Sequence, residues 1–203
     1  MKIICVGRNY VEHIAELNNE RPDEPVLFIK PDSALLAKDF PFVIPDFSQD
    51  IHYEAEVVVK ITKVGKYIEP KFAHKYYDEV SLGIDFTARD IQTKLKEKGL
   101  PWEKAKAFDN SAVVGTFIAK TEFESLVDLP FSFQQNGQVV QQATTAQMIW
   151  NIDELIAEVS KYFMLKKGDL IFTGTPAGVG KVNPGDILEG FLVDKKVFHL
   201  TVK

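Results

Sequence analysis

The chain has 203 residues, of which 45% are hydrophobic and 26% are charged, and its formal net charge is -5. This composition excludes extensive disorder, and the chain is long enough to bury one core, so we expect a single domain over residues 1–203. An acidic chain without a basic stripe is a poor ligand for nucleic acid, and no apolar run is long enough to span a bilayer, so neither is an expected partner.

Most predicted elements are strands. Apolar and alternating runs bounded by turn residues predict them at about residues 2–6, 26–30, 42–44, 52–62, 80–86, 114–119, 129–135, 138–143, 168–173, 186–192 and 196–202. Helical spacing predicts three helices, at about residues 10–18, 88–98 and 152–162, with Thr87 and Asn151 as the expected N-caps of the last two. Tight turns are expected at Asn136-Gly137, a type I′ hairpin signal, and at residues 183–186. Strands joined by short helices favour an α+β, mostly β roll over a doubly wound sheet.

The single cysteine bears on the cellular compartment. Cys5 lies in an apolar strand, where a buried and unreactive thiol is expected, and one cysteine cannot form an intrachain disulfide. Both observations fit a reducing compartment. Met1-Lys2 leads directly into this short strand, which is much shorter than the apolar region of a signal peptide, so we expect a cytoplasmic protein.

Two side chains in the first predicted helix form a candidate catalytic pair. His13 and Glu16 are spaced i,i+3 and project from one helical face. The carboxylate can orient the imidazole, whose other nitrogen then accepts a proton from water, as in many hydrolases. The alternative is a surface pair on a polar helix face.

Residues 51–59 contain the strongest metal-binding signal. Glu54 and Glu56 lie two apart in a predicted strand, so their carboxylates share one face, opposite an apolar face that packs inward. Like charges held this close repel unless a positive charge lies between them. Hard carboxylate oxygens favour Mg²⁺, Mn²⁺ or Ca²⁺ over zinc. The alternative is an exposed strand face with solvated glutamates.

A third carboxylate ends the next predicted strand. Asp85 lies where the helix at 88–98 begins, and Arg89 and Gln92 are three apart on one face of that helix, beside it. Arg89 is positioned to grip a substrate carboxylate with two hydrogen bonds. The alternatives are a capping role for Asp85 and a surface ion pair for Arg89. Three lysines on the same helix, interrupted by Glu97, are interpreted as a solvated face: Lys94, Lys96 and Lys98.

A glycine-rich segment at residues 173–180 follows the strand at 168–173. Its backbone N–H groups and the Thr175 hydroxyl can approach an anion closely. It is not a phosphate-binding GxxxxGK[ST] loop, because the lysine and the hydroxyl are missing at the required spacing. The alternative is a plain glycine turn.

Several motifs together resemble the fumarylacetoacetate hydrolase family, and within it the small acylpyruvate hydrolase and oxaloacetate decarboxylase branch. They occupy residues 7–10, 25–31, 52–56, 83–90 and 173–180, and they include His13, Glu16 and Lys106. The resemblance implies a mixed β-roll or sandwich with one divalent cation, Mg²⁺ first and Mn²⁺ or Ca²⁺ as alternatives, bound by Glu54, Glu56 and Asp85.

The same resemblance implies roles for other residues. His13, Glu16 and Lys106 would be catalytic, and residues 10–20 would form a lid helix. The implied substrate-binding residues are Arg8, Lys30, Arg89, Gln92, Gly174 and Thr175. A homodimer is also implied, and aromatic residues that one small roll would not hide support it: Phe117, Phe131, Phe133, Phe191 and Phe198.

The implied substrate is a small 2-oxo acid. In the first hypothesis the enzyme hydrolyses a C–C bond of acylpyruvates such as acetylpyruvate or fumarylpyruvate. His13, oriented by Glu16, activates water, Lys106 stabilises the oxyanion, and the cation absorbs the charge of the departing pyruvate enolate. The alternatives are oxaloacetate decarboxylation, keto–enol tautomerisation of oxaloacetate, and an isomerase or decarboxylase reaction on a diacid such as 2-hydroxyhepta-2,4-diene-1,7-dioate. A metal-binding fold without activity is disfavoured by the intact catalytic motifs.

Overall fold

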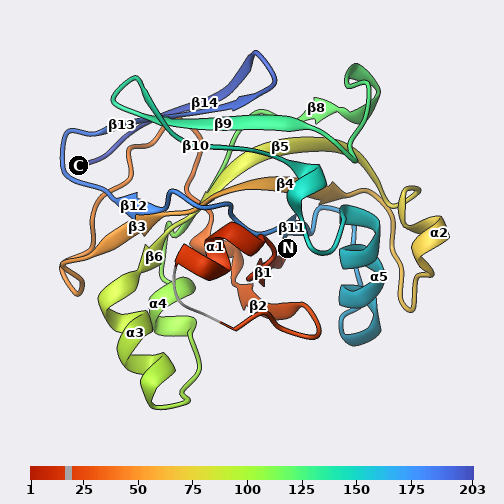
Figure 1. Cartoon of the computed structure of the whole chain (residues 1–203), viewed down its shortest axis with the longest axis horizontal. Helices are drawn as coiled ribbons and strands as arrows, with labels where there is room; N and C mark the ends of the chain where they lie inside the picture. Colours follow the sequence, from red (N-terminus) through yellow and green to blue (C-terminus); the bar gives the residue numbers. More distant parts are fainter. Residues whose placement is uncertain (17–19) are drawn as a thin grey trace.

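Strands contain more of the chain than helices do (Figure 1). The computed structural model describes residues 1–16 and 20–203, and within them the strands form three sheets. The largest sheet contains, in spatial order, β2 (Val26–Lys30), β1 (Ile3–Gly7), β11 (Leu170–Phe172), β4 (Ala55–Ile61), β5 (Tyr77–Asp85) and β7 (Ala112–Val114), and β8 (Ile118–Ala119) also pairs with β5. The second is β10 (Gln138–Thr144), β9 (Pro130–Gln135), β13 (Ile187–Leu192) and β14 (Lys195–Thr201). The third is β12 (Gly180–Lys181), β3 (Ile51–Tyr53) and β6 (Thr87–Ala88).

The helices are short and lie at the periphery. They are α1 (Val11–Glu16), α2 (Pro70–Ala73), α3 (Arg89–Glu97), α4 (Glu103–Lys106) and α5 (Ile152–Tyr162), together with 3₁₀ turns at Asp32–Ala34, Lys120–Glu122 and Thr145–Gln147. The β1–β11 pair is parallel, whereas the other strand pairs of the described chain are antiparallel, so the large sheet is mixed. The α+β, mostly β prediction is therefore confirmed. None of the described helices combines the length and the apolar character needed to cross a membrane.

The main hydrophobic core lies between the large sheet and the four-stranded sheet, which runs over β4 and β5 in Figure 1. Val57 and Val59 of β4 pack there with Phe131 of β9 and Leu192 of β13, all almost fully buried. Burying one such side chain contributes roughly 1.5–3 kcal/mol. Helix α5 closes one end of this core with three apolar residues at helical spacing, Leu155, Ile156 and Val159.

Helix α5 has the bounds that the sequence predicts, and Asn151 caps it. Asn151 Oδ1 accepts a hydrogen bond of 3.0 Å from the Glu154 amide, and Glu154 Oε2 accepts one of 2.8 Å from the Asn151 amide. The two turn predictions also hold. Asn136 and Gly137 both have positive φ, as a type I′ turn requires, and the Asp186 amide bonds the Asn183 carbonyl at 3.1 Å.

The predicted strand at 52–62 is broken at Glu54, and this break builds the site. Before it, β3 pairs with β12 and β6; after it, β4 pairs with β11 and β5. The neighbouring strand changes sheets at the same level, because β5 ends at Asp85 and β6 begins at Thr87. The Asp85 amide bonds the Glu54 carbonyl at 2.8 Å, so the two crossing points lie side by side.

Several sequence predictions are wrong in detail. Thr87 does not cap α3: the helix begins at Arg89 after Ala88, without a side-chain cap, and the Thr87 hydroxyl bonds elsewhere. Residues 42–44 form no strand in the described structure, where Phe42 makes an isolated bridge to Val202. The predicted strand at 114–119 is two strands, β7 and β8. The first helix begins at Val11, and residues 17–19 of the expected lid at 10–20 lie outside the described residues.

The aromatic argument for a homodimer fails for two of its five residues. Phe131 and Phe133 are buried inside the chain, and Phe117, Phe191 and Phe198 are at least partly buried. The homodimer itself stays a prediction, which a mass measurement by light scattering would check.

Candidate functional site

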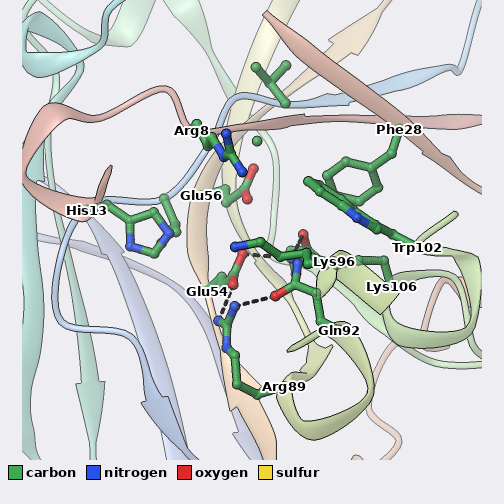
Figure 2. A pocket seen from close by; sticks show the side chains of 14 residues that line it. Arg8, His13, Phe28, Glu54, Glu56, Arg89, Gln92, Lys96, Trp102 and Lys106 are labelled. Atoms are coloured by element: carbon green, nitrogen blue, oxygen red, sulfur yellow. Dashed lines mark hydrogen bonds and ion pairs between the residues drawn. The ribbon is translucent and has the colours of Figure 1, made fainter. Parts of the chain in front are cut away.

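The crossing point of the strands opens into a small pocket of about 40 Å³ (Figure 2). Its walls come from the segment after β1, from α1, from the β3–β4 and β5–β6 breaks, and from α3 and α4. Nine of the twelve predicted site residues line it: Arg8, His13, Glu54, Glu56, Asp85, Arg89, Gln92, Lys106 and Thr175. The other three, Glu16, Lys30 and Gly174, lie behind residues of this set.

Glu54, Glu56 and Asp85 form a cluster of buried carboxylates. One oxygen from each lies within 4.8 Å of the other two. Their residues are only 6%, 2% and 0% exposed, which excludes the alternative of a solvated strand face. The Gly174 amide donates to Glu56 Oε2 at 2.7 Å, and the Lys30 ammonium lies 2.7 Å from Asp85 Oδ1.

Burial and mutual repulsion act on the three carboxylates differently. Burial, followed by the charges of Asp85 and Glu54, raises the pKa of Glu56 well above its ordinary value. Burial also acts to raise the pKa of Glu54, but the charges of Lys106 and Arg89 outweigh it and hold that pKa below its ordinary value. The cluster therefore needs further positive charge before all three groups can ionise together.

Lys106, at the end of α4, supplies part of that charge. Its ammonium donates to Glu54 Oε2 at 2.8 Å, to Asp85 Oδ2 at 2.7 Å and to Thr87 Oγ1 at 2.6 Å. Burial opposes a raised pKa of Lys106, but the charges of Asp85 and Glu54 outweigh it and raise that pKa. The lysine is therefore a fixed cation beside two carboxylates, while its neighbour Lys104 is exposed.

Lys30 has a different place from the one expected. It is fully buried behind Asp85, with Nζ 2.7 Å from Asp85 Oδ1, and it does not line the pocket. Its ammonium also donates to the carbonyls of Lys106, Phe86 and Ser111. Lys30 therefore anchors Asp85, Phe86 and the end of α4, and its direct contact with substrate stays a prediction.

Arg89 and Gln92 share one face of α3, as the sequence predicts. Arg89 Nη1 donates to Gln92 Oε1 at 2.6 Å, and Nη2 donates to Glu54 Oε1 (Figure 2). Arg89 thus connects the carboxylate cluster to the pocket wall formed by α3.

His13 points into the pocket from the opposite wall, toward the glutamates (Figure 2). Its Nδ1 lies 3.1 Å from Glu16 Oε2, and the Gly178 amide donates to Glu16 Oε1 at 3.0 Å. With Nδ1 held by a carboxylate, Nε2 is the nitrogen left for proton transfer in the pocket. The predicted pair therefore forms, and the glycine-rich segment holds it.

The glycine-rich segment uses its polar groups within the protein. The Gly174 amide bonds Glu56, and the Thr175 hydroxyl donates to the Ala55 carbonyl at 2.9 Å and accepts from Gln141 Nε2 at 2.9 Å. The Gly174 contact positions Glu56, and the binding of a substrate anion by Gly174 and Thr175 stays a prediction. Gln141 also accepts from the Ala55 amide at 3.0 Å.

Sequence reasoning misses some contributors to the pocket. Phe28 and Trp102 form an edge-to-face pair, with ring centroids 6.0 Å apart, and close one wall. Lys96 is exposed, as predicted, but it lines the pocket rather than a fully solvated face. The alternation of β10 could have shown Gln141 to be an inward-facing polar residue, but nothing in the sequence indicates its partners.

The carboxylate cluster fits a hard divalent cation. All three donors are carboxylate oxygens close enough to share one ion, and all three residues are buried. Such an ion would also supply the positive charge that the raised pKa of Glu56 indicates is needed.

Fold and cluster together define the class of protein. The sequence matches the family model for the fumarylacetoacetate (FAA) hydrolase C-terminal domain over residues 2–194, so the chain belongs to the fumarylacetoacetate hydrolase family. It is 44% identical to the oxaloacetate tautomerase YcgM of Escherichia coli, over 92% of this chain and 86% of that protein. It is 42% identical to a mitochondrial oxaloacetate decarboxylase of Dictyostelium discoideum, over 93% and 87%.

A solved structure extends the comparison. Fumarylpyruvate hydrolase from Pseudomonas aeruginosa, in complex with Mn²⁺ and pyruvate, superposes with a TM-score of 0.93 at 33% identity, covering 100% of this chain and 89% of that one. These relatives indicate that the protein is an enzyme.

Proposed function

We propose that the protein catalyses the keto–enol tautomerisation of oxaloacetate, with one divalent cation held by Glu54, Glu56 and Asp85. The observation that carries this proposal is that an imidazole held by a carboxylate faces a buried cluster of metal-type ligands across one small pocket. The sequence alone ranks acylpyruvate hydrolysis first. The names of the two relatives at 44% and 42% identity favour the oxaloacetate reactions instead.

The reaction moves one proton. A bound cation would act as a Lewis acid on the 2-oxo oxygen and so acidify the neighbouring CH₂ group. His13 Nε2 takes the proton from C3 and gives it to the former 2-oxo oxygen, so that keto and enol forms interconvert without gain or loss of atoms. Glu16 keeps the imidazole in place, and the fixed charge of Lys106 stabilises negative charge that develops on oxygen.

The lining of the pocket supports a short substrate. Phe28 and Trp102 pack edge to face and close one wall. A four-carbon 2-oxo acid needs less room beside this wall than an acylpyruvate with a long chain.

Acylpyruvate hydrolysis is the second candidate, since a solved fumarylpyruvate hydrolase shares the fold at 33% identity. The same His13–Glu16 pair would then activate water. Decarboxylation of oxaloacetate needs neither water nor removal of a C3 proton, so it depends least on this pair.

The test is a substrate panel with Mg²⁺ and with Mn²⁺. Oxaloacetate in its keto and enol forms, acetylpyruvate and fumarylpyruvate are followed by enol absorbance and by pyruvate release. Equilibration of the two oxaloacetate forms much faster than pyruvate release supports the tautomerase. Rapid pyruvate release from an acylpyruvate, without accelerated enol equilibration, would replace it with the hydrolase.

A further inference from the structure

Four cationic side chains line a pocket that contains three carboxylates. Arg89 and Lys106 pair with Glu54 inside the cluster. Arg8 and Lys96 also line the pocket, from the segment after β1 and from α3 (Figure 2). With a divalent cation added to three negative and four positive side chains, the pocket holds an excess of three positive charges. That excess matches an anionic ligand carrying more than one negative charge.

The backbone of Arg8 supports a binding role. Arg8 has φ of 60°, in the left-handed region that side chains other than glycine and asparagine seldom occupy. Within the described residues its guanidinium has no hydrogen bond or ion pair. Unfavourable backbone of this kind is typical of functional sites, where it aims a side chain at a ligand.

Lys96 lies near Arg8 and Arg89. Partial burial, and then the charges of Arg8 and Arg89, lower the pKa of Lys96. Figure 2 shows its side chain extending from α3 across the pocket. Three cations therefore converge at the pocket mouth although like charges repel, and an anion placed among them would relieve that repulsion.

We propose that Lys96 and Arg8 form a subsite for the second carboxylate of a dicarboxylic 2-oxo acid. This subsite makes oxaloacetate a better substrate than an acylpyruvate whose distal group is uncharged. The inference rests on the proposed function and deepens it. The 2-oxo acid end faces the carboxylate cluster and Arg89, and the distal carboxylate receives charge-assisted hydrogen bonds from Lys96 and Arg8.

The chain offers a matched control on the same helix. Lys94 is exposed and does not line the pocket, so Lys94→Gln removes the same charge from α3 without touching the proposed subsite. Lys96→Arg retains the charge and serves as the conservative variant.

The experiment compares oxaloacetate with acetylpyruvate, which lacks the second carboxylate. Loss of a charge-assisted hydrogen bond predicts that Lys96→Gln raises KM for oxaloacetate by about 10- to 100-fold with little change in kcat. KM for acetylpyruvate stays unchanged. Lys94→Gln changes neither substrate by more than about 2-fold, and Lys96→Arg recovers most of the oxaloacetate affinity. Arg8→Gln follows the pattern of Lys96→Gln.

Binding without turnover gives an independent measurement. In 3,3-difluoro-oxaloacetate, fluorine replaces both C3 hydrogens and blocks enolisation. Calorimetry in Mn²⁺ should show that Lys96→Gln weakens this ligand and leaves pyruvate unaffected. Equal losses for mono- and dicarboxylates, equal effects of Lys94→Gln and Lys96→Gln, or no effect at all would overturn the subsite. If the wild-type protein turns over none of these acids, the proposed function fails, and the binding comparison alone decides on the subsite.

Discussion

Glu16 and Gly178 are joined by a hydrogen bond of 3.0 Å although 162 residues separate them in the chain. Gly178 has φ of 97°, and a Cβ there would come within 2.2 Å of the Val140 carbonyl oxygen, so the loop requires glycine at this position. Because Glu16 also holds His13, a loop near the C-terminus fixes the imidazole supplied by the N-terminal helix.

The first prediction concerns this pair. His13→Ala should lower oxaloacetate tautomerisation by roughly 10²- to 10⁴-fold, the usual contribution of a positioned general base. Glu16→Gln should cause a smaller loss, because the imidazole keeps a hydrogen-bonding neighbour but loses its charged partner. Stopped-flow absorbance of the enol measures both rates, with Mn²⁺ affinity by calorimetry as the control. An unchanged rate in His13→Ala would exclude the imidazole as the base.

The second prediction concerns the cation. Asp85→Asn removes one carboxylate from the cluster and leaves the buried ammonium groups of Lys30 and Lys106 without that counter-charge. We expect loss of stoichiometric Mn²⁺ binding in calorimetry and a stability loss of about 3–5 kcal/mol in urea. Asp78→Asn, on the exposed part of the same strand, is the matched control and should bind Mn²⁺ normally. Tight binding of one Mn²⁺ by Asp85→Asn would contradict the ligand assignment.

The third prediction concerns the aromatic wall. Trp102 and Phe28 separate the metal-binding pocket from a neighbouring cavity of about 420 Å³ that also touches Leu100. Trp102→Ala should join the two spaces, so kcat/KM for acylpyruvates with long apolar chains should rise relative to that for oxaloacetate. Leu100→Ala enlarges only the neighbouring cavity and should leave the ratio unchanged. A ratio that does not move in Trp102→Ala would show that the wall does not limit chain length.

The fourth prediction concerns acid stability. Asp186 accepts hydrogen bonds from Gln135 Nε2 at 2.7 Å, Asn136 Nδ2 at 2.9 Å and the Asn183 amide at 2.7 Å. Burial acts to raise its pKa, but these bonds outweigh burial and hold the pKa below its ordinary value. The ionised form is therefore favoured in the folded state. Its contribution is complete above the unfolded value of about 3.9 and disappears as the pH falls through the lower folded value.

The corresponding measurement compares the wild-type protein with Asp186→Asn. The difference in Tm should be constant from pH 7 to about pH 5 and should shrink toward zero as the pH approaches 2. A difference that grows on acidification would contradict the sign of this linkage.

Some of the site could be predicted from residue spacing. Glu54 and Glu56 are two residues apart in extended backbone, and His13 and Glu16 are three apart in a helix, so local geometry alone puts each pair on one side. Helix α5 was predictable to the residue because its apolar spacing and its cap agree. Local signals of this kind do not depend on the rest of the fold.

The remaining features depend on contacts between distant segments. The break at Glu54 cannot be recognised in a run of strand-forming residues. It arises because two paired segments of the chain pass from one sheet to another at the same place. Lys30 resembles a substrate ligand in its motif, but its position behind Asp85 follows from how β2 meets α4. Lys96 has the exposure expected of a surface lysine, and only the tertiary structure shows that the pocket lies beneath it.

The carboxylate cluster lies where buried strands cross, whereas Arg8, Lys96 and Trp102 are supplied by a turn, a peripheral helix and a loop. Substitutions in these outer segments can alter substrate choice while the metal ligands keep their geometry. Evolution can therefore diversify the reactions of such a scaffold at low risk to its folding, and an engineer who wants a new substrate should randomise residues 96–102 and leave β4 and β5 untouched.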